Sequence, residues 1–137
     1  MAGAATVSIK VNVTGLGSDV EVTNSKTMTV PVEYQAGYTV LTTATATALQ
    51  LFALVDHFDL DDIFGVYIKA EVGTVYITVD TAGTGTITAT TADLLLNVGE
   101  ACYLPININT AANLGLLVDG SAVTAAISWL ILARVSA

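Results

Sequence analysis

The stretch FGVYIKAEVGTVYITVD, residues 64–80, predicts two short β-strands joined by a turn near Glu71 to Thr74, which carries Gly73. β-Branched and aromatic side chains suit the pleated, half-buried surface of a sheet. The same bias extends over the whole chain, because 20 of its 137 residues are threonine and 17 are valine. The sequence therefore favours an all-β fold.

Two segments near the start of the chain alternate between apolar and polar residues. In ATVSIKVNV, residues 5–13, the apolar set is Val7, Ile9, Val11 and Val13. In KTMTVPVEY, residues 26–34, it is Met28, Val30, Val32 and Tyr34. A period of two predicts, in each segment, a strand with one wet face and one buried face. Because Pro31 cannot donate a ladder hydrogen bond, the second strand is expected at a sheet edge or a bulge.

Further apolar segments follow along the chain, with turns rich in Gly, Asn and Asp between them. They include DLLLNV (93–98), ACYLPININ (101–109), LGLLVD (114–119) and AVTAAISWLILARV (122–135). Strands at intervals of about 8 to 12 residues are typical of two packed sheets. We therefore predict one domain over residues 1–137, an antiparallel β-sandwich that is jelly-roll-like and has about 8–10 strands.

The segment TATATALQLFALVDHF, residues 43–58, fits two kinds of structure. Its apolar residues have helical spacing, yet they also alternate as they would in a strand. We expect a strand up to Val55 and then an irregular or short helical turn from Asp56 to Asp62. One short helix near residues 48–63 therefore stays open.

The composition excludes several classes of function. Hydrophobic residues make up 53% of the chain and charged residues 12%, about half of what is usual in soluble domains. A surface so poor in charge is typical of an oligomer or of a subunit in a larger assembly. The net charge is −8, and the four basic residues are scattered as Lys10, Lys26, Lys69 and Arg134. Binding to nucleic acid or to an anionic membrane surface is therefore not expected.

Neither a membrane span nor a signal peptide is expected. The 22 residues from Tyr34 to Val55 carry no charge, but they contain five threonines and no basic residue flanks them closely. The first fifteen residues lack a basic segment followed by an apolar one.

The run DHFDLDDIF, residues 56–64, holds the single histidine and four of the twelve acidic residues. Asp59, Asp61 and Asp62 are the best metal candidates, with Asp56 and His57 beside them. The spacing does not match an EF-hand loop, because Gly65 comes one residue late and no Glu follows at the required distance. A transition metal would need more His or Cys ligands. We therefore favour a solvated connection packed on Ile63, Phe64 and their apolar neighbours, and expect no metal and no cofactor.

No arrangement of residues points to catalysis, so we expect the chain not to be an enzyme. The serines lie in no G-x-S-x-G motif, and no glycine-rich phosphate loop is present. Cys102 lies in an apolar stretch, which favours a buried and unreactive thiol. Trp129, the only tryptophan, is expected in the core of the final strand.

As a whole, the chain resembles the head decoration (cement) proteins of tailed bacteriophages. The resemblance rests on the β pattern of most of the chain, on turns such as NVGEACYLPININ (97–109) and on the hydrophobic final strand AAISWLILARVSA (125–137). It implies a jelly roll or related sandwich on the capsid surface of a virion, made in the host cytoplasm and without catalytic residues. The implied partners are the major capsid protein and copies of the chain itself, as a homotrimer or dimer.

Two alternatives stay open. The chain could be another virion component, in the neck, tail or a fibre. It could also be a carbohydrate-binding β-sandwich module, for which exposed aromatics would be the signature. The candidates are the five tyrosines, Tyr34, Tyr38, Tyr67, Tyr76 and Tyr103. Their placement in apolar alternation favours the core or an interface instead.

Overall fold

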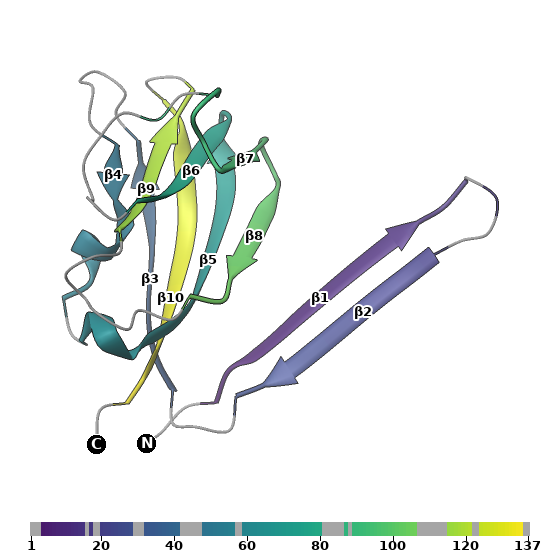
Figure 1. The fold of residues 1–137 in the computed structure, drawn as a ribbon, viewed down its shortest axis with the longest axis horizontal. Helices are drawn as coiled ribbons and strands as arrows, with labels where there is room; N and C mark the ends of the chain where they lie inside the picture. Colours follow the sequence, from purple (N-terminus) through teal and green to yellow (C-terminus); the bar gives the residue numbers. More distant parts are fainter. Residues whose placement is uncertain are drawn as a thin grey trace.

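Two four-stranded antiparallel sheets face each other, and a two-stranded hairpin projects from one end of them (Figure 1). The computed structural model describes residues 4–15, 17, 20–28, 32–41, 48–56, 59–80, 87, 89–106, 115–121 and 124–135. The long sheet contains, in order, β3 (Val32–Val40), β10 (Ala126–Arg134), β5 (Ile63–Val72) and β8 (Ala101–Leu104). The short sheet contains β4 (Leu49–Gln50), β9 (Gly115–Gly120), β6 (Val75–Asp80) and β7 (Leu94–Leu96). This architecture confirms the predicted all-β class and sandwich-like arrangement.

The strands of the two sheets pair in a nested order. β3 pairs with β10, β4 with β9, β5 with β8, and β6 with β7, each time antiparallel. The first of these strands is thus bonded to the last, and the pairs close inward toward the middle of the segment. Two further ladders, between β10 and β5 and between β6 and β9, join the pairs into sheets.

The core lies between the sheets, and the hydrophobic final strand crosses it. Along β10, Ile127, Trp129 and Ile131 point inward and are buried, as the sequence predicted for the tryptophan. The Trp129 ring lies against Gly37 of the neighbouring strand, and its Nε1 donates a hydrogen bond to Thr39 Oγ1 at 3.0 Å. The indole is therefore held both by packing and by a polar contact.

The two strands predicted within residues 64–80 are present as β5 and β6. They do not pair with each other, because β5 belongs to the long sheet and β6 to the short one. The turn between them takes the chain from one sheet to the other. Gly73 makes this corner with a φ of +70°, which an L side chain rarely adopts.

Two predicted strand boundaries are wrong. Residues 26–34 do not form one strand: β2 ends at Thr27 and β3 begins at Val32, while Pro31 lies outside the described residues. β3 is nevertheless at the edge of the long sheet, as expected. The strand expected up to Val55 ends at Gln50, whose Oε1 accepts hydrogen bonds from the backbone N–H of Phe52 (3.4 Å) and of Leu116 (2.8 Å).

The 3₁₀ turn η1 (Leu51–Leu54) replaces the rest of that strand. The second 3₁₀ turn, η2 (Leu60–Asp62), lies between Asp56 and Asp62, where an irregular or short helical turn was expected. Both turns fall in the range where a short helix was left open. Among the residues that the structure describes, no helix is long and apolar enough to cross a membrane. The first residues of the uncharged run, up to Val40, belong to β3.

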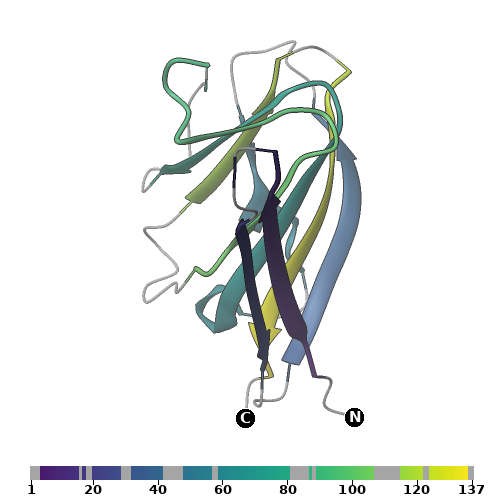
Figure 2. The same cartoon turned by 90° about the vertical axis from the view of Figure 1, so that its right-hand side faces the viewer.

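The hairpin of β1 (Thr6–Val13) and β2 (Val20–Thr27), called the arm below, lies apart from the sandwich (Figures 1 and 2). The predicted alternation is correct for β1, but the prediction that one of its faces is buried is wrong. Every residue from Val20 to Thr27, and nearly all of β1, is exposed. A strand gains a buried face only if another layer covers it, and none of the sheets in the described part of the chain covers the arm.

Candidate interaction surface

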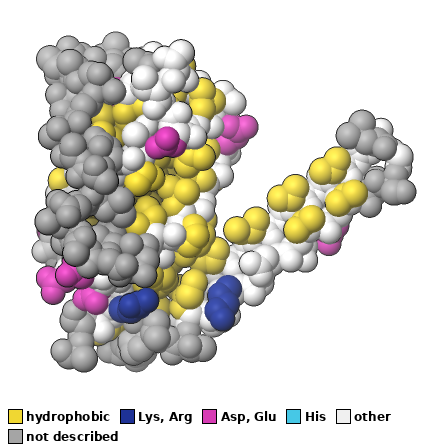
Figure 3. Space-filling model, in the orientation of Figure 1, with side chains coloured by type: hydrophobic (Ala, Val, Ile, Leu, Met, Phe, Trp, Pro, Cys, Tyr) yellow, Lys and Arg dark blue, Asp and Glu magenta, His cyan; other side chains and the backbone are white. Residues whose placement is uncertain are grey.

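One face of the arm carries an apolar row, which Asn24 and Lys26 interrupt on β2, opposite Ile9 and Val7. In the antiparallel register Val11 lies opposite Val22 and Val13 opposite Val20, so these side chains share a face. Ile9 is on the same face. These five side chains are between 42% and 60% exposed. Figure 3 shows the apolar side chains following one another along the arm.

The opposite face of the arm is polar and holds the two strands together. Hydroxyl pairs join Thr6 to Thr27 and Ser8 to Ser25, each at 2.9 Å, and Lys10 Nζ lies 2.9 Å from Glu21 Oε2. The ion pair is exposed, so it adds little stability. Because an isolated two-stranded hairpin is only marginally stable in water, the arm is a structure that gains from being covered.

A second apolar surface is the outer face of the long sheet. We call it the tyrosine face, and its members are Tyr34, Tyr38, Tyr67, Tyr103, Leu130 and Leu132. Tyr34 and Tyr38 are 64% and 60% exposed and Tyr67 is 37% exposed. These three tyrosines therefore lie outside the core, which leaves the interface as the part of the expectation that still applies to them, whereas Tyr76 packs partly buried beside the small cluster around Leu117.

The strand register sets the spacing of the exposed tyrosines. Leu130 lies opposite both Ala36 and Tyr67, so Tyr67 is level with the midpoint between Tyr34 and Tyr38. Four residues along a strand span about 13 Å, and crossing two strands spans about 10 Å. The three rings thus mark the corners of a triangle around Leu130.

Tyr103 completes this surface because Gly65 leaves room for it. A Cβ at residue 65 would collide with the Tyr103 hydroxyl and come within 2.9 Å of the ring. The ring therefore lies across β5, and partial burial raises the pKa of Tyr103. The sequence signal for this contact was a glycine inside a strand, which marks a close approach.

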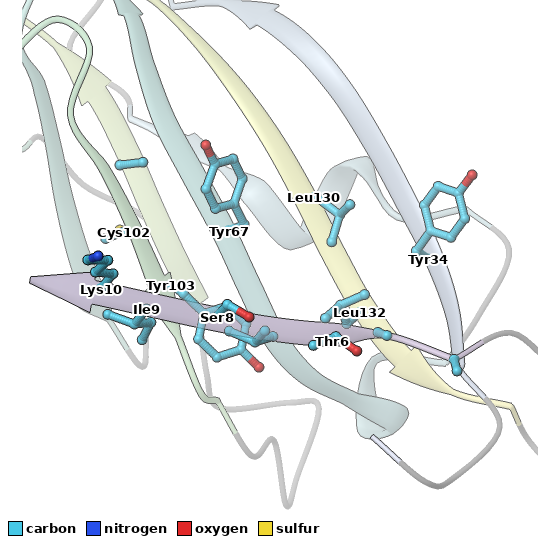
Figure 4. A pocket seen from close by; sticks show the side chains of 14 residues that line it. Thr6, Ser8, Ile9, Lys10, Tyr34, Tyr67, Cys102, Tyr103, Leu130 and Leu132 are labelled. Carbon is cyan, nitrogen blue, oxygen red and sulfur yellow. The ribbon is translucent and has the colours of Figure 1, made fainter. Parts of the chain in front are cut away.

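A groove of about 690 Å³ separates the base of the arm from the tyrosine face. Residues 4–10 form one wall, and the tyrosine face apart from Tyr38, together with Ala101 and Cys102, forms the other (Figure 4). In Figure 2 the arm stands in front of the long sheet. The groove is therefore open, apolar and bounded by the two surfaces described above.

A polar cluster lies on the same face of the sheet, farther along β5. Glu71 accepts a hydrogen bond from Ser128 Oγ at 2.8 Å and from Lys69 Nζ at 3.0 Å. The Ser128 hydroxyl, and after it Lys69, lower the pKa of the Glu71 carboxyl below its ordinary value. In the strand register, Ser128 and Lys69 of this cluster lie level with Tyr38, so the tyrosine face has polar groups beside it.

The acidic run forms a connection between η1 and β5. Asp59 and Asp61 are exposed, and the N–H of Asp62 donates to the carbonyl of Asp59 at 3.1 Å. Ile63 is buried below them and Phe64 partly so. Within the described part of the chain, no three His, Cys, Asp or Glu residues are grouped so that they could hold a metal ion. His57 and Phe58 lie outside the described residues.

Cys102 packs from β8 against the core and is partly rather than fully buried. Burial raises the pKa of its thiol, while a backbone hydrogen bond with Ile68 acts in the opposite direction. A protonated thiol is a poor nucleophile, so this site offers no activated sulfur.

Comparison with protein-family models, with curated proteins and with solved structures gave no match.

Proposed function

We propose that this chain is a structural subunit of a bacteriophage virion, a non-enzymatic decoration protein on the capsid surface. The observation that carries the proposal is the arm with its open apolar face. Contiguous apolar patches on soluble proteins mark sites of interaction, and a projecting hairpin reaches beyond the body that bears it.

The topology supports the same proposal. The proposal includes a jelly-roll fold, and the strand orders β3-β10-β5-β8 and β4-β9-β6-β7, paired as nested hairpins, support it. This fold occurs in viral capsid proteins and in lectins. A fold alone does not choose between functions, so the choice rests on the arm.

A decoration protein binds weakly at many equivalent positions, so avidity replaces affinity at each contact. Uncharged Val, Thr and Tyr surfaces lose their water at little cost, whereas a buried unpaired charge is expensive. The major capsid protein and further copies of this chain are the proposed partners.

The test is to purify the particles of a phage whose genome encodes this chain. Mass spectrometry then detects the chain in the particles, and cryo-electron microscopy locates it on them. We expect density for the sandwich at the junctions between capsomers. Density in the neck, tail or fibres would select the alternative virion role. Absence of the chain from the particles would refute both.

The tyrosine triangle favours a second candidate, a carbohydrate-binding module. Tyrosine rings offer an apolar face and a polar hydroxyl, which suits stacking on sugar rings. Calorimetric titration with soluble oligosaccharides distinguishes this function. Saturable binding that is lost in Tyr34→Ala and kept in Val98→Ala, an exposed control in the turn before β8, would support it over the virion role.

A further inference from the structure

We propose that the apolar face of the arm docks on the tyrosine face of a second copy, and that two copies exchange arms reciprocally about a two-fold axis. The inference rests on the proposed assembly role and specifies its self-partner.

The dimensions of the two surfaces match. Each strand of the arm has eight residues and is therefore about 26 Å long. β3 and β10, which carry most of the tyrosine face, have nine residues each and are about 30 Å long. The arm thus fits along the long sheet without overhanging it.

The buried surface area distinguishes the docking of one arm on one partner from the reciprocal exchange of two arms. A two-stranded ribbon about 26 Å long and about 10 Å wide has a footprint on the order of 250 Å². One arm on one sheet would bury roughly 500 Å² in total, which is less than a specific interface needs. Two exchanged arms bury roughly 1,000 Å², which reaches that requirement and closes the assembly with identical contacts.

The charge distribution favours contact through the arm. Residues 6–27 contain Lys10, Lys26, Asp19 and Glu21 and have no net charge. The rest of the chain holds two basic and ten acidic residues and carries the full net charge of −8. Two sandwich bodies would repel each other in direct contact, whereas an arm approaches a body without this penalty.

The groove joins the arm to the tyrosine face of the same copy, so the two surfaces proposed to make contact between copies are adjacent. Its walls are the base of the arm and the tyrosine face of the same copy, and it is open to solvent. An arm from a second copy would enter beside this wall and cover Tyr34, Tyr67 and Leu130. Aliphatic side chains against aromatic rings are a favourable pairing between β surfaces.

The first experiment measures the mass of the full chain by light scattering and by sedimentation at micromolar concentrations. Val22→Asp places a charge in the middle of the apolar face, and Thr23→Asp places the same charge on the polar face one residue later. We expect a dimer for the native chain and for Thr23→Asp. We expect Val22→Asp to be monomeric, with a dissociation constant raised at least about 100-fold. The fluorescence of Trp129, which lies in the core of the sandwich, should be equal for all three, because the arm lies outside that core.

The second experiment identifies what the arm touches. A chain with Val22→Cys is mixed with a chain carrying Tyr67→Cys, both in a Cys102→Ala background, under mild oxidation. We expect a mixed disulfide dimer after mixing, and much less product from either chain alone. Cross-links mainly between two Val22→Cys chains would assign the face to arm–arm pairing and overturn the proposal.

The two proposals fail in different ways. A native chain that is monomeric at all concentrations, yet attaches to particles through Val22, would refute arm exchange and assign the arm to the capsid protein. A dimer that shows the expected cross-link but never occurs on particles would refute the virion role alone. Equal behaviour of Val22→Asp and Thr23→Asp would also overturn arm exchange.

Discussion

Two glycines of the long sheet face opposite sides of it, and replacing each with alanine should have very different consequences. A Cβ at Gly37 would lie 2.7 Å from Trp129 Cζ2 and 2.9 Å from Cε2, too close for any real contact. The Trp129 ring is only 6% exposed and is bonded to Thr39, so it has no free space to enter. A Cβ at Gly65 would meet Tyr103, whose hydroxyl is the free end of a side chain on the outer face.

The magnitudes follow from these contacts. In Gly37→Ala, shifting the indole breaks its hydrogen bond, about 1 kcal/mol, and adds overpacking strain of about 1 kcal/mol. We therefore expect a loss of about 2 kcal/mol in the free energy of unfolding and a Tm lower by roughly 6–8 °C. In Gly65→Ala, Tyr103 can swing outward, so we expect a loss below about 0.5 kcal/mol.

The assay is urea and thermal unfolding at one fixed protein concentration, followed by circular dichroism and by fluorescence of the single tryptophan. Displacement of the indole should change its emission in Gly37→Ala and leave it unchanged in Gly65→Ala. The reasoning is refuted if the two variants lose equal stability, or if Gly37→Ala is as stable as the native chain.

Three further predictions concern titratable groups and metal ions. The lowered pKa of Glu71 contributes stability that is present above its ordinary value of 4.5 and is lost as the pH falls through the lowered value. Ser128→Ala should therefore move the Glu71 titration upward in NMR, and an unchanged titration would contradict this cause. The raised pKa of Cys102 predicts that its thiol reacts slowly with a thiol reagent at pH 8 in the folded chain and fast in urea. Equal rates would show that the thiol is accessible to solvent in the folded chain. Removing divalent ions with a chelator should leave the Tm unchanged, whereas a lower Tm would assign a metal to Asp59, Asp61 and Asp62.

The position of the apolar surfaces could be predicted only in part from the sequence. Trp129 was placed in the core correctly, because its strand has no charged residue before Arg134 and such an apolar stretch has few other places to lie. For Tyr34, Tyr38 and Tyr67 the sequence left the core and an interface open, because the local pattern around an exposed tyrosine is the same as around a buried one. The end of the strand at Gln50 was also missed, because its cause is a hydrogen bond with Leu116, 66 residues away.

Periodicity is a local property, so the sequence by itself determined that this chain forms β-strands and which side chains share a face. The segments VSIKVNV (7–13) and VYIKAEV (66–72) both begin with the pattern V-x-I-K. Yet Ile9 is 49% exposed on the arm, while Ile68 is fully buried in the long sheet. Only the tertiary structure decided between these outcomes, because burial depends on whether a second layer lies opposite the strand. The nested pairing of the strands from β3 through β10 builds two sheets, and the short sheet covers β5. In the described part of the chain, neither sheet covers β1.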